Sequence, residues 1–267
     1  MRTLKAATGT GPRRNRLGTK ALAAGAVLFL SMNAGPSAAA ELRISGAATV
    51  AGGIINPNKA AIEQETGLTL NLTVNGDGNG LKDLYAGKVD VAMVAAPLKV
   101  TEETLNKANP GSISVAGFEV APVGTASIKF ITNPANPVKS LTDNQLRGIF
   151  TGKITSWKDV GGADQPILVV AETPGLGTRA NIVTSFLDGA DITDKARAMQ
   201  ALVQVAQVVA QAPNAIGYGN AASITSAVAV LPGTDVKQPL GLATKGAPSA
   251  DVKKLIEATA KYSVAAK

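Results

Sequence analysis

The chain has 267 residues, with 26 lysines and arginines, 19 acidic residues, no histidine and no cysteine. These counts exclude a disulfide framework, a thiolate metal site, a cysteine nucleophile and any mechanism that needs an imidazole base. Aromatic residues make up 3% of the chain, too few for stacking platforms along single-stranded nucleic acid. Hydrophobic residues make up 45%, enough for a substantial core in a chain of this length.

The formal net charge of +7 comes almost entirely from one end of the chain. Six of the basic residues and none of the acidic residues lie in residues 1–40, which leaves 20 basic against 19 acidic residues in the remainder. A nearly neutral remainder lacks the basic surface that nucleic-acid binding requires. We therefore expect no nucleic-acid partner.

Residues 1–40 have the pattern of an export signal peptide. A basic stretch ends at Lys20, an apolar run spans residues 21–30, and residues 37–40 fit a cleavage site before Glu41. The alternative is a transmembrane anchor, but the apolar run is too short to cross about 30 Å of hydrocarbon.

The expected processing decides where the protein acts. Cleavage near Ala40 and Glu41 predicts a periplasmic or secreted protein without stable membrane insertion. The pair Arg13-Arg14 leaves a twin-arginine route open, although the residues after it favour the general secretory route.

The rest of the chain alternates strand and helix patterns. Strands are predicted at residues 42–44, 68–74, 89–94, 113–123, 127–132, 166–170, 227–232 and 240–243. Helices are predicted at residues 59–64, with Gly67 as C-cap, at 81–86, at 141–150, from the 175–179 loop to Leu187, at 195–211, and from Ser249 or Asp251 onward. This order is typical of α/β proteins with a mostly parallel sheet.

The predicted helix at 195–211 carries glutamines at helical spacing, namely Gln200, Gln204, Gln207 and Gln211. They could mark a protein-partner face, but a solvated helix face is the better explanation.

Three loops share one plan, in which a strand leads through a small-residue turn into a helix. They are residues 45–49, 76–80 and 175–179. Helix N-termini present free N–H groups and a partial positive charge, so each loop could receive an anion. Alternatively, each loop is only a tight connection, because short glycine patterns are weak signals.

Two segments carry a family resemblance. The chain reads NPANPVKSLT at 133–142 and QLRGIFTGKITSW at 145–157, and shorter matches occur at 80–82, 87, 89–90, 95–98, 160–162 and 175–179. These residues resemble the extracytoplasmic phosphate-binding proteins of phosphate ABC transporters. The resemblance implies a two-lobed, type II-like periplasmic-binding-protein fold that closes on its ligand. We expect lobe 1 to comprise residues 41–126 plus 222–267, and lobe 2 residues 127–221.

The resemblance also implies a function without catalysis. It points to capture of phosphate or a related oxyanion by a monomeric protein that passes its ligand to an ABC permease, with no cofactor and no metal. The implied ligand-binding residues lie in the three loops: Ala48, Thr49, Asp77, Gly78, Asn79, Gly177, Thr178 and Arg179.

The ligand positions depart from the family pattern. A hydroxyl-bearing residue is replaced by Leu176, the acidic acceptor of the family by Ala95, and a serine by Asp77, while Glu172 lies just before the third loop. Lost donors and added carboxylates weaken the binding of an anion. Two compensations are open: Arg179 could supply the counter-charge, or Asp77 could accept a hydrogen bond from a protonated phosphate.

Two other functions are weighed. The first keeps the fold but loses phosphate, giving a sensor or accessory protein that recognises another small polar ligand, such as an amine or polyol, or a protein. The second is a hydrolase or transferase, which the missing histidine and cysteine disfavour. Asp90, Asp159 and Asp164 could bind a hard cation, but they read better as scattered surface carboxylates.

Overall fold

One eight-stranded mixed sheet runs through residues 39–262, which are the residues that the computed structural model describes. In chain order the strands are β1 (Ala40–Gly46), β2 (Leu68–Val74), β3 (Val91–Val94), β4 (Phe118–Thr132), β5 (Leu168–Glu172), β6 (Arg197–Met199), β7 (Ala215–Gly219) and β8 (Ala229–Lys245). Their order across the sheet is β2-β1-β3-β8-β4-β7-β5-β6. The pairs β1–β2, β1–β3, β5–β6 and β5–β7 are parallel, and the three pairs that involve β4 or β8 are antiparallel.

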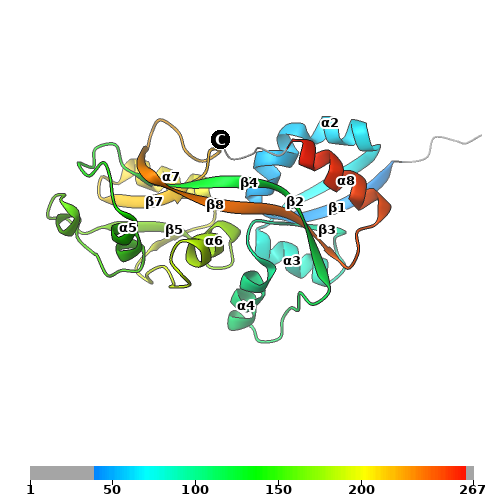
Figure 1. Ribbon diagram of the computed structural model, residues 1–267, viewed down its shortest axis with the longest axis horizontal. Coiled ribbons are helices and arrows are strands. Elements are labelled where there is room, and N and C mark those ends of the chain that lie inside the picture. Colours follow the sequence, from blue (N-terminus) through cyan, green and yellow to red (C-terminus); the bar gives the residue numbers. More distant parts are fainter. Residues whose placement is uncertain (1–38, 263–267) are drawn as a thin grey trace, which may run out of the picture. The chain divides into compact units, whose positions relative to one another are not determined.

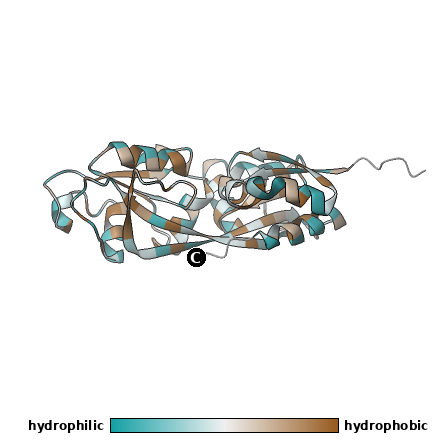
Figure 2. Ribbon diagram, turned by 90° about the horizontal axis from the view of Figure 1, so that it is seen from above, coloured by the Kyte–Doolittle hydropathy of each residue, from teal (hydrophilic) through white to brown (hydrophobic). Residues whose placement is uncertain are grey.

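Helical segments connect most pairs of consecutive strands. They are α1 (Ala48–Val50), the π-helical η1 (Ala51–Ile55), α2 (Asn56–Thr66), α3 (Asp77–Tyr85), α4 (Leu98–Ala108), α5 (Asp143–Phe150), the 3₁₀-helical η2 (Trp157–Val160), α6 (Gly177–Ser185), α7 (Leu202–Gln211) and α8 (Ala250–Lys261). Their turns carry hydrophobic residues next to hydrophilic ones (Figure 2), as expected for helices that cover a sheet with one face. Within the described residues, none of these helices has the length and hydrophobicity needed to cross a membrane.

The two longest strands, β4 and β8, run side by side through the sheet (Figure 1). They contribute to two groups of buried residues. The first group, here the first core, takes its residues from 42–126 and 240–262, and the second core from 128–236. β4 and β8 pair along most of their 15 and 17 residues and contribute to both cores. Two register shifts interrupt this pairing, one of them between Pro122 and Gly124.

The packing bears on the lobe bounds, which remain a prediction. The first bound, between residues 126 and 127, coincides with the change from the first core to the second along β4. The second bound, before residue 222, does not coincide with such a change. Val228, Leu231 and Val236 pack in the second core because the first half of β8 pairs with β4 there.

Several element predictions are wrong in detail. The helix predicted at 195–211 begins only at Leu202, because Arg197–Met199 pairs with β5 as the parallel strand β6. The strands predicted at 113–123 and 127–132 are replaced by β4, which starts at Phe118, and the last two predicted strands are one, β8. The helix predicted at 59–64 belongs to a longer helical run from Ala48.

Other local predictions are confirmed. Gly67 ends α2 with a left-handed φ of 70°, which a glycine adopts without steric cost. Ser249 caps α8 by accepting a hydrogen bond from the Val252 N–H. Three of the four glutamines, Gln204, Gln207 and Gln211, lie exposed on one helix, α7, and Gln200 lies before it.

Candidate functional site

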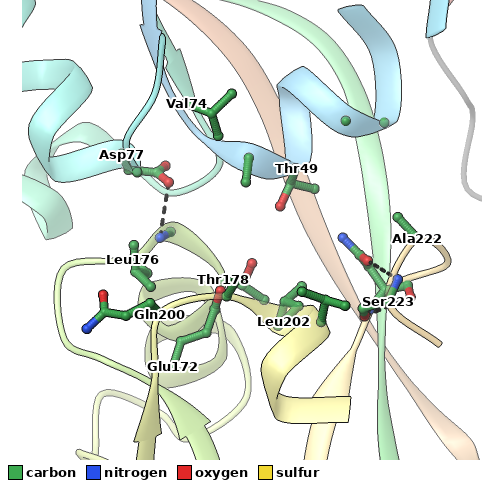
Figure 3. Close-up of a pocket in the computed structure, with 18 of the residues that line it drawn as sticks. Thr49, Val74, Asp77, Glu172, Leu176, Thr178, Gln200, Leu202, Ala222 and Ser223 are labelled. Carbon is green, nitrogen blue, oxygen red and sulfur yellow. Dashed lines mark hydrogen bonds between the residues drawn. The ribbon is translucent and has the colours of Figure 1, made fainter. Parts of the chain in front are cut away.

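A cavity of about 470 Å³ lies where the loops after β1, β2 and β5 meet the start of α7 and the segment after β7. Figure 3 shows Thr49 and Asp77 on one side of it and Thr178, Glu172 and Gln200 on the other. The described residues that line the cavity include two carboxylates, Asp77 and Glu172, and neither lysine nor arginine. The cavity is therefore rich in hydrogen-bonding groups but has no lining cation.

Asp77 lies at the edge of the cavity and contacts two of the elements around it. Its carboxylate accepts hydrogen bonds from the Ala95 N–H at 2.5 Å and from the Gly177 N–H at 3.1 Å. Ala95 follows β3 and lies 18 residues after Asp77, and Gly177 is the first residue of α6 and lies 100 residues after it, so the side chain joins elements far apart in sequence. Burial raises the pKa of Asp77 to about 6, although these hydrogen bonds act in the opposite direction.

Glycines let the backbone come close enough for these contacts. α3 packs tightly on β1 because Gly80 has no side chain: a Cβ there would lie 2.6 Å from the Cα of Gly46. Gly177 lacks a side chain where the Asp77 carboxylate lies, and a Cβ there would be 2.5 Å from the Asp77 Cγ. The third loop therefore has room for the Asp77 carboxylate only because residue 177 is glycine.

Glu172 ends β5 and is 6% exposed. Among the described residues, its Oε2 atom has no hydrogen-bond partner. Burial raises the pKa of Glu172 to about 8, and the negative charge of Asp77 adds to this effect. Glu172 is therefore mostly protonated at neutral pH, which avoids a second buried negative charge beside Asp77.

Arg179 does not face the cavity. Its guanidinium donates to the backbone carbonyl of Glu172 at 3.0 Å and to that of Ile192 at 3.4 Å. The residue lines a different hollow, between α4, α6 and the loop near Asp191. The proposed role of Arg179 as counter-charge in the cavity gains no support from this position.

The other predicted site residues divide into two sets. Ala48, Thr49, Gly177 and Thr178 line the cavity. Gly78 instead lies within α3 next to Leu105, and Asn79 is exposed and donates to the Asn75 carbonyl at 2.9 Å. These two residues do not line the cavity.

Four polar residues near the site were not predicted. Gln200, Asn220 and Ser223 line the cavity, and Gln238 lies behind it and donates to the Ala95 carbonyl at 2.9 Å and to the Thr178 hydroxyl at 3.2 Å. Asn220 and Ser223 lie just after the end of the strand β7. The three predicted loops also follow the ends of strands, so this position was a signal that could have found these two residues. Gln238 is in the middle of β8 and has no such signal.

No cation site forms from the carboxylates considered above. Asp90 pairs with Arg43 at 2.8 Å and Asp164 with Lys158 at 3.0 Å. Within residues 39–262, no group of three His, Cys, Asp or Glu side chains is placed to hold a metal ion.

Comparison with known proteins identifies relatives of this chain and of its fold. The phosphate-binding protein PstS of Bacillus subtilis is 30% identical over 188 residues, which are 68% of this chain and 59% of that protein. The chain thus spans less than two thirds of the length of this relative. A structure described as that of a phosphate ABC transporter substrate-binding protein from Clostridium perfringens, with bound phosphate, has 25% identity and a TM-score of 0.69 and covers 82% of this chain and 92% of its own.

A further structure supports the fold. An ABC-type phosphate transport receptor from Vibrio cholerae has 22% identity and a TM-score of 0.63, and covers 82% of this chain and 93% of its own. The sequence profile of the PBP superfamily domain matches residues 31–263. The predicted α/β, two-lobed binding-protein fold is thereby confirmed, and the chain belongs to the PBP superfamily.

Proposed function

We propose that this protein is an extracytoplasmic, non-catalytic solute-binding protein that captures phosphate or a related oxyanion for an ABC permease. Its relatives are named for phosphate binding and phosphate transport. The cavity between Thr49, Asp77 and Thr178 is the proposed site. Residues 1–38, which hold most of the expected signal peptide, lie outside the described part of the chain, so export is part of the proposal.

The observation that carries this proposal is that two backbone N–H groups, those of Ala95 and Gly177, donate to the Asp77 carboxylate. Ala95 and Gly177 already hold one oxyanion, the side-chain carboxylate, in a buried position. The second of these donors lies at the N-terminus of the nine-residue helix α6, where the helix dipole favours a negative charge. A phosphate oxygen can use the same two donors, and two hydroxyl-bearing residues, Thr49 and Thr178, line the same cavity.

The charges of the cavity set the form of ligand that fits. Two carboxylates and no lining cation oppose a phosphate dianion, because like charges in a cavity of low dielectric repel strongly. Protonated Glu172 removes one of these charges at neutral pH. We therefore expect the monoanion to bind, and to bind more tightly at pH 6 than at pH 8.

Calorimetric titration with phosphate, with sulfate as a second oxyanion, tests this function. Thr178→Val should weaken phosphate binding about 10- to 150-fold, the equivalent of one hydrogen bond to a charged group. Thr184→Val is the matched control, because this threonine lies on α6 but bonds the Ala180 carbonyl and not the cavity. If millimolar phosphate gives neither heat nor a thermal shift between pH 5 and 8, the proposed ligand is wrong.

The unpartnered Oε2 of Glu172 favours a second candidate, a sensor or accessory protein whose ligand carries an amine or hydroxyl groups. Such a group could pair with this oxygen and with Asp77 without repulsion. Ethanolamine and glycerol are the probes in the same calorimetric experiment. Binding of either probe, lost in Glu172→Gln and absent for phosphate, would replace the first candidate with the second.

A further inference from the structure

The Asp77 carboxylate is held as a bound ligand would be held. It is 3% exposed, and its two oxygens take N–H donors from two different loops. Neither of these two donors is on α3, the helix that carries Asp77. The glycine at 177 leaves the space that this carboxylate fills.

The same carboxylate lies at the edge of the cavity proposed for the solute. Each backbone N–H has one hydrogen to donate, so the donors of Ala95 and Gly177 cannot fully serve Asp77 and a free oxyanion together. A second anion within hydrogen-bond reach of these donors would also lie within a few ångströms of the Asp77 charge. The side chain and a free anion therefore exclude each other.

We propose that Asp77 is an internal competitor for the ligand: its carboxylate fills the oxyanion position between Ala95 and Gly177, and a free anion binds only after it leaves these donors. This inference rests on the proposed function, because it concerns the same cavity. It makes Asp77 a specificity-determining residue that weakens the capture of anions. It also chooses against the alternative in which Asp77 accepts a hydrogen bond from a protonated phosphate.

This inference and that alternative predict opposite effects of replacing Asp77 on the affinity for phosphate. Asp77→Ser removes the carboxylate and leaves both N–H groups free, so phosphate should bind at least about tenfold more tightly than to the unmodified protein. Asp159→Ser, which removes an exposed carboxylate in η2, is the matched control and should leave the affinity unchanged. Tighter binding to Asp77→Ser supports competition, whereas weaker or equal binding overturns it.

A second measurement needs no ligand. The ¹H–¹⁵N amide signals of Ala95 and Gly177 should shift together with pH, with one midpoint near 6, because both report on the same carboxylate. Asp77→Asn should abolish this shared shift. Saturating phosphate at a fixed pH should move both signals, because the carboxylate then leaves both donors.

Other groups near Asp77 could also shift these amides. The titratable and charged side chains on the elements packed around it are Glu172 on β5, Tyr218 on β7, Arg179 on α6, Lys82, Asp83 and Tyr85 on α3, Lys99, Glu102, Glu103 and Lys107 on α4, Glu41 and Arg43 on β1, and Asp235, Lys237 and Lys245 on β8. Glu172 is the group whose own pKa responds to Asp77, so Glu172→Gln is the control and should keep a shared midpoint in the two amides.

The two proposals fail in different ways. If the two amides shift together but phosphate binds neither the unmodified protein nor Asp77→Ser, the phosphate function is wrong and the placement of Asp77 stands. If phosphate binds the unmodified protein and Asp77→Ser binds it no better, the function stands and competition is refuted. Independent shifts of the two amides would likewise refute it.

Discussion

Replacing Glu172 by glutamine should change how the stability of the protein depends on pH. The pKa of Glu172 is about 8 in the folded protein, against an ordinary value of 4.5, because the carboxyl is buried beside Asp77. A raised folded-state pKa stabilises the fold fully below pH 4.5, and this contribution is lost as the pH rises through about 8. The difference between the two values corresponds to about 5 kcal/mol.

Glutamine has nearly the shape of glutamate but cannot ionise, so the Glu172→Gln variant does not lose this stability as the pH rises. The free energy of unfolding of the variant relative to the unmodified protein should therefore rise by up to about 5 kcal/mol between pH 4.5 and 8.5. In melting temperature this is a relative gain of about 10–20 °C for a protein of this size. The contributions of Asp77 and Tyr218, which both proteins share, largely cancel in the difference.

Urea unfolding followed by the fluorescence of Trp157 measures this difference. Trp157 is the one tryptophan of the chain and is 2% exposed, so its emission reports unfolding. Glu257→Gln, which removes an exposed carboxylate from α8, is the matched control. A stability difference between Glu172→Gln and the unmodified protein that stays constant from pH 4.5 to 8.5 would refute the reasoning.

Two further predictions concern the packing around the site. Tyr218→Phe should lower the free energy of unfolding in urea by about 1–3 kcal/mol, because the buried Tyr218 hydroxyl accepts the Glu172 N–H at 3.1 Å. Tyr85→Phe, at an exposed site, is the control, and equal stability of the two variants would contradict this prediction. Gly80→Ala should lower the melting temperature by forcing α3 from β1, at a cost of about 1–3 kcal/mol, whereas Gly53→Ala, with open space around its Cβ, should gain about 0.5–1 kcal/mol. Thermal melts in which both alanine variants behave alike would show that α3 does not rest on β1 as described.

The sequence was informative where the signal is local. The caps at Gly67 and Ser249 are confirmed because a left-handed glycine and an N-cap serine act within one turn of a helix. The helix predicted at 195–211 failed for the opposite reason. Its first residues are taken by a parallel pairing with β5, and such a pairing depends on residues far away in sequence.

The candidate site shows the same division. The loops of Thr49, Asp77 and Thr178 were predicted from their place between a strand and a helix, and these residues line one cavity. The direction of the Arg179 side chain could not be predicted, because the carbonyls that it binds belong to β5 and to the chain near Ile192. The environment of Asp77 was also unpredictable, since its donors are Ala95, just after β3, and Gly177, at the start of α6.

The sequence by itself determined an α/β chain that is nearly neutral after residue 40 and has no histidine or cysteine chemistry. These properties follow from composition and periodicity along the chain, whereas the expectation of a binding protein came from a family resemblance. Only the tertiary structure decided that the carboxylate of Asp77 takes the N–H donors of Ala95 and Gly177 and that Glu172 lies buried beside it. Charge and burial act through space, so the net charge of the cavity is set by residues that only the fold brings together.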